Sequence, residues 1–422
     1  MVWVSLIHNG IAIPKLYNYI NHIKIYYKNT IINVNNNLAT AFYLFKKQPN
    51  TDKTFIKNFM NSIQQYLPVH CKNCKMSDFK ITCCNNNNIE KTKINYLKYK
   101  TCYVNGKKEK IDRYLAEPLC IFVGRGKHKL RGTFKPAIKE SDITLNISKG
   151  YKPKGNWKLI INNKNVDWIA CWTDHISNKI KYVYPSSSSI LKSSNTVAKF
   201  DFSRKIKNKL NIIRKKYISD FSSSNEKVIQ HGIACYLIDS QCIRCGTDDE
   251  NNTYGCTSLQ TKHIKIKNNN INLNFVGKDS IIFDKTFKCK YPIVITYLEA
   301  TCKSKTSSDD LFHLITSTSL NVYLNTIVKD LTAKVFRTCH ASSMYDKLLH
   351  QSKSIEEFKS ANSKVAILCN HTNLQTSKAN YLDPRITYAF SKRSNINIEN
   401  LYSKQLIEKF QWAKNTTSDF RF

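Results

Sequence analysis

The excess of basic residues is the feature of this sequence that most constrains the folded molecule. The 422 residues include 66 Lys and Arg but only 30 Asp and Glu, which gives a formal net charge of +36. A surface with this charge repels itself unless a polyanion binds it, and nucleic acid is the usual polyanion. Asparagine runs at 35–37, 85–88 and 268–270 indicate a compositional bias that also favours lysine. Such a bias does not remove acidic residues, so the charge still predicts a nucleic-acid partner.

The chain is long for a single hydrophobic core, and two or more domains are expected. Its hydrophobic content of 41% is ordinary for a globular protein. The clearest boundary is Pro185 followed by the four serines 186–189, because proline interrupts regular structure and serines favour a flexible joint. We therefore expect one domain over residues 1–189 and another beyond it.

Short strands and turns are expected over residues 100–185. Residues 157–161 and 166–172 are strand-like and flank an Asn-Asn-Lys-Asn turn, so they predict a β-hairpin. After the boundary, residues 200–245 have helical spacing of apolar residues, and Gly246 is the expected end of that helix.

Alternation of apolar and polar residues over 262–284 predicts a further hairpin with a Lys-Asn-Asn-Asn turn, and Gly277-Lys278 makes a second turn. Residues 310–350 return to helical spacing, with Lys334 and Arg337 three residues apart and therefore on a shared face.

The 15 cysteines are scattered, and the N-terminal residues MVWVSLIHNGIAI lack the apolar core of a secretory signal. This usage predicts an intracellular protein with free thiols. The sequence has no stretch of 18 apolar residues, so no membrane span is expected.

One group of cysteines has the residue types of a zinc site. His70, Cys71, Cys74, Cys83 and Cys84 offer thiolates and an imidazole, and the first two cysteines have C-x-x-C spacing. The adjacent second pair would strain a tetrahedral site, so free thiols are favoured and no metal is predicted.

Breaking a DNA strand without a metal requires a particular set of side chains. A side-chain oxygen must attack the phosphorus, and fixed cations must meet the charge on the non-bridging oxygens, which arginine does best. A lysine or histidine must protonate the leaving 5′-oxygen. A sequence suited to this chemistry holds two arginines, a lysine, a histidine and a tyrosine, without clustered carboxylates.

Seven segments of this sequence resemble the eukaryotic type IB topoisomerases, in the order found in that family. Two carry the most specific patterns, Leu331–Ser342 (LTAKVFRTCHAS) and Ser377–Thr387 (SKANYLDPRIT), the second resembling the motif of the active-site tyrosine. The other five are Glu117–Gly126, Trp172–Ile176, Cys242–Gly246, Phe275–Ser280 and Val365–His371.

The resemblance implies an α+β fold with two lobes forming a DNA clamp. Residues 1–189 are the expected DNA-binding cap, with mixed helices and strands. Residues 190–371 are the expected catalytic core, mostly α-helical with a small antiparallel sheet, and residues 372–422 the segment that carries the tyrosine.

The resemblance also implies catalytic roles. Tyr381 attacks the phosphate and becomes linked to the 3′ end, while Arg244 and Arg337 grip the non-bridging oxygens. His371 donates a further hydrogen bond to one of these oxygens, and Lys278 protonates the leaving 5′-oxygen.

Further residues are expected to contact DNA. Lys334 lies one helical turn before Arg337, and the resemblance places Arg125, Asp279 and Asn380 beside the cleavage site. Thr376, just before the tyrosine motif, is the remaining DNA-binding candidate.

The sequence departs from the nuclear enzymes in three respects. Only nine residues separate His371 from Tyr381, where the nuclear enzymes carry a long helical hairpin. Val123 replaces an arginine usual before Gly-Arg-Gly. A compact form without the long charged N-terminal extension is also expected.

The expected function is therefore relaxation of supercoiled double-stranded DNA, in replication or transcription, without ATP, metal or cofactor. We expect a monomer in the nucleus, with a viral replication compartment or virion as the alternative. One competing hypothesis is a tyrosine recombinase, but recombinases usually carry histidine where Lys334 stands. The other is a basic DNA-binding protein without catalytic activity, which an intact catalytic set disfavours.

Overall fold

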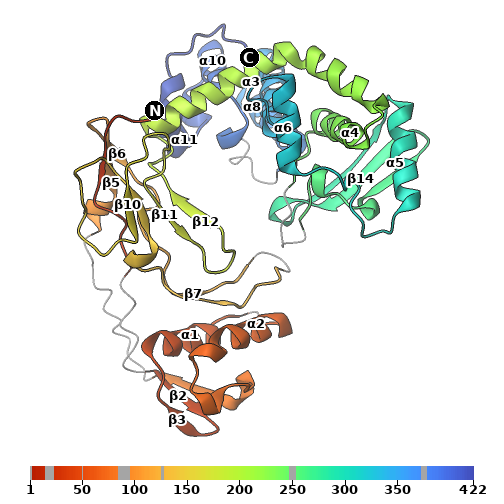
Figure 1. Cartoon of the computed structure of the whole chain (residues 1–422). Coiled ribbons are helices and arrows are strands. Elements are labelled where there is room, and N and C mark those ends of the chain that lie inside the picture. Colours follow the sequence, from red (N-terminus) through yellow and green to blue (C-terminus); the bar gives the residue numbers. More distant parts are fainter. Residues whose placement is uncertain are drawn as a thin grey trace. The chain divides into compact units, whose positions relative to one another are not determined.

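The computed structural model describes residues 2–14, 23–49, 51–83, 96–124, 128–246, 253–371 and 378–422. The chain divides into two compact units, Met1–Lys192 and Ser193–Phe422. Short strands dominate the first unit, and helices with one small sheet dominate the second (Figure 1). The predicted α+β class is confirmed. No helix in the described ranges combines the length and apolar character needed to cross a membrane.

Within its described residues, the first unit holds short sheets and two α-helices. The helices are α1 (Asn36–Lys46) and α2 (Lys53–Ile63). In sheet order, the strands are β1 (Leu6–His8), β5 (Thr101–Val104) and β6 (Lys107–Lys110); β3 (Thr30–Ile32), β2 (Ile23–Tyr27) and β4 (Phe79–Cys83); β7 (Cys120–Ile121) and β8 (Phe134–Lys135); and β10 (Leu159–Ile161), β9 (Thr144–Asn146), β11 (Ala170–Thr173) and β12 (Ile180–Val183).

Helices α1 and α2 show how local sequence sets these elements. Asn35 and Asp52 cap their N-termini, since each side chain accepts a hydrogen bond from the backbone N–H three residues later. Helix α2 then buries one stripe, including Phe55 and Phe59, in a core shared with Phe42 of α1. The rings of Phe42 and Phe59 meet edge to face at 5.7 Å, a favourable aromatic geometry.

The hairpin predicted for residues 157–172 is wrong. Strand β10 pairs in parallel with β9, and β11 pairs antiparallel with β9 on its other edge. Strand β9 therefore lies between the two strands expected to pair with each other. The 162–165 connection is a link between non-adjacent strands and not a hairpin turn.

The four serines after Pro185 form a hydrogen-bonded turn and not a flexible joint. Ser186 and Ser189 are buried, the backbone N–H of Ser186 donates to Lys110 O at 2.7 Å, and that of Ser189 donates to Ser186 O at 2.9 Å. Helix α3 (Ile190–Ser219) starts directly after this turn, so the division between the units falls inside its first turn.

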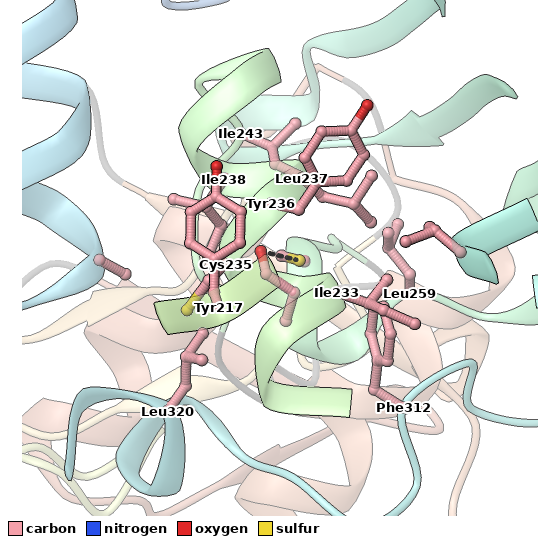
Figure 2. Close-up of a cluster of buried hydrophobic side chains, with 14 of the residues drawn as sticks. Tyr217, Ile233, Cys235, Tyr236, Leu237, Ile238, Ile243, Leu259, Phe312 and Leu320 are labelled. Atoms are coloured by element: carbon pink, nitrogen blue, oxygen red, sulfur yellow. Dashed lines mark hydrogen bonds between the residues drawn. The ribbon is translucent and has the colours of Figure 1, made fainter. Parts of the chain in front are cut away.

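One core of the second unit surrounds α4, and Figure 2 shows part of it. Besides α3, the helices of its described residues are α4 (Glu226–Gln241), α5 (Pro292–Ser304), α6 (Ser317–Ile327), α7 (Ala333–His350), α8 (Ile355–Leu368), α10 (Pro384–Ser394) and α11 (Lys404–Lys409). Residues 230–239 of α4 are all buried. A helix that is covered on every side forms the centre of a core, and here its neighbours include Leu259, Phe312 and Leu320 (Figure 2).

The small sheet of the second unit contains the predicted hairpin. Strand β13 (Ile264–Lys267) pairs with β14 (Asn270–Val276), which pairs with β15 (Ile282–Lys288). Asn268 and Asn269 take positive φ angles of 51° and 61°, which is typical of a two-residue hairpin turn. The prediction for residues 262–284 is confirmed.

The helix predicted over residues 310–350 is two helices, α6 and α7. Residues 328–332 interrupt it, and Asp330 has a left-handed φ of 65°. Leu320, Leu324 and Leu331 nevertheless all bury their side chains, because both helices pack against the same core. The spacing predicted the buried face correctly but not the break.

Candidate active site

Arg244 is placed by the end of α4. The helix ends at Gln241 because Cys242 takes a left-handed conformation, with φ 54°, and donates its N–H to Ile238 O at 3.0 Å. Gly246, the predicted helix end, lies four residues further on. Its φ of +93° and its close approach to Gly255, where an added Cβ would lie 2.9 Å away, explain the glycine.

Lys278 lies in the tight connection between β14 and β15. It begins a 3₁₀ turn, Lys278–Ser280, and its side chain is exposed. The N–H of Gly277 donates to Ile281 O at 2.8 Å and closes the turn, while Tyr254 N–H donates to Val276 O at 2.8 Å. The lysine is therefore presented from a backbone that is held on both sides.

Arg337 projects from α7 and is 3% exposed. One terminal nitrogen, Nη2, donates to Cys369 O at 2.6 Å and lies 3.4 Å from Nε2 of His371. Its Nε is buried and has no hydrogen-bond partner among the described residues. A buried donor without a partner needs an explanation, and an anionic ligand is one.

His371 links the two arginines. Its Nε2 also lies 3.5 Å from Nη2 of Arg244. A guanidinium can only donate, so Nε2 acts as the acceptor in both contacts. The segment before the histidine is held by Lys285, whose Nζ donates to Leu368 O at 3.3 Å.

Tyr381 lies against the same residues. Its ring centroid is 4.7 Å from the guanidinium carbon of Arg337 and 5.3 Å from the imidazole of His371. The side chain is 7% exposed and packs in the core shared by α7, α8 and α10. Its carbonyl accepts a bond from Ser342 Oγ at 2.8 Å, which ties the tyrosine to α7.

A pocket unites the cationic candidates. Arg244, Lys278 and Arg337 line it together with Tyr254, and Cys369 and Asn370 close one side. The structure thus brings together the five residues predicted to be catalytic. Arg244, Lys278 and Arg337 line the pocket, and His371 and Tyr381 contact Arg337 directly. The arrangement offers cations and a phenol at one place, which suits attack on a phosphodiester.

The remaining predicted residues differ in position. Lys334 is exposed in the first turn of α7, and so differs from the buried Arg337 despite their shared spacing. Asn380 is exposed and directly precedes Tyr381. Arg125, Thr376 and the side chain of Asp279 lie outside the described residues.

Sequence reasoning missed two lysines next to this site. Lys199 of α3 donates to Asn380 O at 2.8 Å, and Lys409 of α11 donates to Ala379 O at 2.8 Å. Neither lysine belongs to a recognisable motif.

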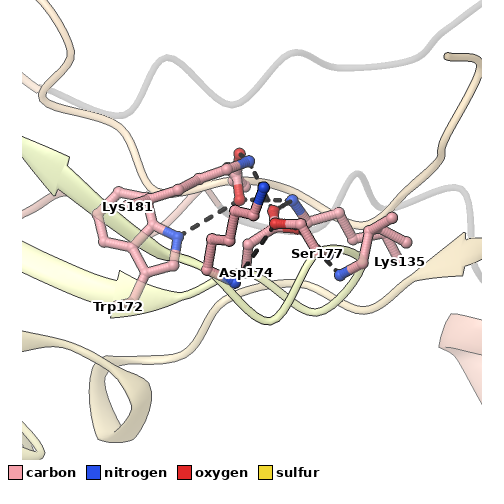
Figure 3. A network of polar contacts seen from close by, with 8 residues as sticks. Lys135, Trp172, Asp174, Ser177 and Lys181 are labelled. Atoms are coloured by element: carbon pink, nitrogen blue, oxygen red, sulfur yellow. Dashed lines mark hydrogen bonds and ion pairs between the residues drawn. The ribbon is translucent and has the colours of Figure 1, made fainter. Parts of the chain in front are cut away.

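In the first unit, residues of the segments Glu117–Gly126 and Trp172–Ile176 meet in a network of ion pairs (Figure 3). Lys135 bonds to both Glu117 and Asp174, and Lys181 bonds to the same carboxylates at 2.5 and 2.6 Å. Trp172 Nε1 donates to Glu117 at 3.4 Å. Burial alone would raise the pKa of Asp174, but the bonds from Lys135 and Lys181 lower that pKa well below its usual range.

The cysteine group of the first unit is described only in part. Cys71 is buried and Cys74 partly buried, while Cys84 and the side chain of Cys83 lie outside the described residues. Within the described part of the chain, no three His, Cys, Asp or Glu side chains are grouped as a metal site requires. Burial raises the pKa of the Cys71 thiol, so it stays protonated near neutral pH.

Comparison with known proteins finds matches along most of the sequence. Residues 188–395 match a family model described as eukaryotic DNA topoisomerase I, catalytic core. Residues 1–93 and 83–185 match the model of the eukaryotic DNA topoisomerase I, DNA binding fragment.

Individual relatives carry the same name. DNA topoisomerase 1 alpha of Arabidopsis thaliana is 30% identical, over 100% of this chain and 59% of the relative. DNA topoisomerase 1 of Candidozyma auris is 32% identical, over 87% of this chain and 55% of the relative. The human DNA topoisomerase I, mitochondrial, is 29% identical, over 74% of this chain and 69% of the relative. The chain thus spans between about half and three fifths of the length of the Arabidopsis and Candidozyma proteins.

Proposed function

Because the chain belongs to the eukaryotic DNA topoisomerase I family, we propose that it relaxes supercoiled duplex DNA by cutting and resealing one strand. The observation that carries the proposal is the packing of the Tyr381 ring against Arg337 and His371, beside the pocket that Arg244 and Lys278 line. A nucleophile, fixed cations and a proton donor are all present within the second unit.

In the proposed reaction, the phenol oxygen of Tyr381 attacks the phosphorus and loses its proton to water as the new P–O bond forms. The bond from phosphorus to the 5′-oxygen breaks, and Lys278 gives a proton to that oxygen. The products are a 3′-phosphotyrosyl end and a free 5′-hydroxyl. Resealing is the reverse reaction, and the phosphotyrosyl bond retains the energy of the original phosphodiester, so ATP is not required.

The arginines act on the charge that develops during attack. Arg337 and Arg244 each reach Nε2 of His371 through Nη2, so a phosphate that enters between them meets two cations already in place. His371 then donates to a non-bridging oxygen instead of accepting from the arginines. Cations that need no rearrangement stabilise a transition state more effectively than mobile ones.

The two units carry different parts of this function in our proposal. Residues 1–189 bind the duplex as a cap, residues 190–371 carry the cationic site, and residues 372–422 carry the nucleophile. Lys334 and Asn380 contact DNA beside the site, together with Arg125, Asp279 and Thr376. The chain acts as a monomer in the nucleus.

A plasmid relaxation assay tests the proposal. The native chain should relax supercoiled plasmid in EDTA without ATP, and Tyr381→Phe should abolish relaxation because the nucleophilic oxygen is gone. Tyr388→Phe is the matched control, since Tyr388 is also buried and lies seven residues further along. Binding of plasmid by the native chain without any relaxation would refute the proposal.

A further inference from the structure

Two carbonyls in the backbone that leads into Tyr381 do not bond to the N–H four residues later. Residues 378–380 are helical, and a helical carbonyl normally accepts from the N–H four residues later. For Asn380 that residue is Pro384, which has no N–H. For Ala379 it is Asp383, whose N–H donates to Ser342 Oγ at 3.1 Å instead.

Two lysines occupy the positions that these carbonyls leave open. Lys199 Nζ donates to Asn380 O and Lys409 Nζ donates to Ala379 O, both at 2.8 Å. The lysines come from α3 and α11, which are far from each other in the sequence. A cation also suits this place because carbonyls at the end of a helical turn carry partial negative charge.

The neighbouring residues are anchored as well. Lys378 Nζ donates to Leu401 O at 3.3 Å, and Ser342 Oγ donates to Tyr381 O. Each of the four residues 378–381 therefore has a bond to another element. These bonds fix the position of the backbone from which the Tyr381 side chain leaves.

We propose that Lys199 and Lys409 are positioning residues, whose bonds to the Asn380 and Ala379 carbonyls aim the Tyr381 phenol at the scissile phosphate. The inference rests on the proposed function of Tyr381 as the nucleophile. It assigns the two lysines no contact with the reacting atoms, so their removal should slow cleavage without weakening DNA binding beyond the loss of one charge.

The surroundings of Lys199 disfavour its positive charge. Burial lowers the pKa of Lys199 to about 7, and the nearby ammoniums of Lys334 and Lys409 add to that effect while the Asp383 carboxylate opposes it. Burial also lowers the pKa of Lys409. Burying a lysine costs desolvation free energy, which the bond from Lys199 to the Asn380 carbonyl partly offsets.

The test measures single-turnover cleavage of a nicked duplex oligonucleotide, in which the short cleaved piece dissociates and the covalent complex accumulates. At saturating DNA, Lys199→Met should cleave about 10- to 100-fold more slowly than the native chain, the range expected for a misplaced nucleophile. Lys199→Arg keeps a donor and a charge and should restore most of the rate.

The matched control is Lys215→Met. Lys215 is an exposed lysine on the same helix, roughly 24 Å further along at 1.5 Å per residue. The Lys215→Met substitution therefore removes one positive charge without affecting the bond to Asn380. DNA affinity is measured for both substitutions in the Tyr381→Phe background, where no cleavage intervenes, and should be the same. A Lys199→Met rate equal to that of Lys215→Met would overturn the inference.

Two further measurements keep the outcomes distinct. If the methionine variant of Lys199 fails to fold in a thermal melt, Lys409→Met tests the other bond, and a native cleavage rate in that variant would overturn the inference. A native chain that forms no covalent complex refutes the proposed function itself. A native chain that forms the complex while both lysine variants match it refutes only the positioning role.

Discussion

Two clusters of cations, one in each unit, differ in the groups to which their side chains bond. In the first, Lys135 and Lys181 share Glu117 and Asp174, so two lysines face two carboxylates and the charges cancel. In the second, three cations near Tyr381 bond to neutral groups: Arg337 to Cys369 O, and Lys199 and Lys409 to the carbonyls before the tyrosine.

This difference separates two uses of the same side chains. A lysine neutralised by a carboxylate fixes structure and has no charge left to offer a ligand. A cation held by a carbonyl is also fixed, but no carboxylate neutralises it, so the Arg337 guanidinium keeps its charge for a phosphate. The comparison therefore predicts that substitutions in the first network reduce stability, while those around Tyr381 reduce catalysis.

The largest expected effect concerns Arg337. Arg337→Lys keeps one positive charge but loses the planar donors that face His371 and Cys369, so cleavage should slow about 100- to 1,000-fold while the melting temperature changes little. The measurement is single-turnover cleavage together with a thermal melt. Arg421→Lys is the control, because Arg421 pairs with Asp346 at 3.0 Å and should stay within a few-fold of the native rate. An equal loss of cleavage rate in Arg337→Lys and Arg421→Lys would contradict the distinction between neutralised and carbonyl-bound cations.

A smaller effect, on stability alone, is expected at Asp174. Its carboxylate is 3% exposed, so Asp174→Asn leaves Lys135 and Lys181 without one of their partners and should destabilise the first unit by about 3 kcal/mol. Denaturant unfolding of the whole chain, followed by Trp fluorescence, measures the change. Cleavage per folded molecule should stay at the native level at saturating DNA; a large loss there would show that the network contributes directly to chemistry.

The smallest effect concerns pH and His8 in the first unit. Burial lowers the pKa of His8 to about 4, with its Nε2 2.9 Å from Asn146 O and its Nδ1 accepting from Gly10 N–H at 3.1 Å. The unfolded chain, with a histidine pKa near 6.5, binds the proton more readily, so this contribution is complete above about pH 6.5 and declines as pH falls toward 4.

From pH 6.5 to 5, His8 should therefore account for a loss of about 2 kcal/mol. His8→Gln, which can bond to the same two groups but does not titrate, should flatten this part of the stability curve. The lysine network should contribute nothing in this range, since the pKa of Asp174 lies far below it. If His8→Gln keeps the native dependence of unfolding free energy on pH, His8 is not its cause. Other buried histidines, such as His231 and His263, would then account for it.

Local patterns predicted the fold wherever the contacts were local. The 264–288 sheet could be predicted because its strands are adjacent in the sequence and the first two are joined by asparagines that take positive φ angles. The 157–172 hairpin failed because β9, a strand from earlier in the chain, inserts between β10 and β11. The break near Asp330 was missed because the apolar spacing continues across it.

Residues of the candidate site also differ in whether the sequence could predict them. Arg337 and His371 could be predicted from the sequence because they lie in motifs and their side chains are of types suited to phosphodiester chemistry. Lys199 could not, because its partner is a carbonyl 181 positions away, and carbonyls are identical at every residue. The available signal was Pro384, whose missing N–H shows that Asn380 O needs a donor from elsewhere.

The anchored stretch 378–381 also bears on how faithfully a cut strand is rejoined. In the proposed reaction, the 3′ end is attached to a tyrosine whose own backbone is tied to α3, α7 and α11. Only the 5′ end is then able to turn. The break has one stationary side, so the two ends that are sealed are the two that were separated, and the order of the bases is preserved without any template being read.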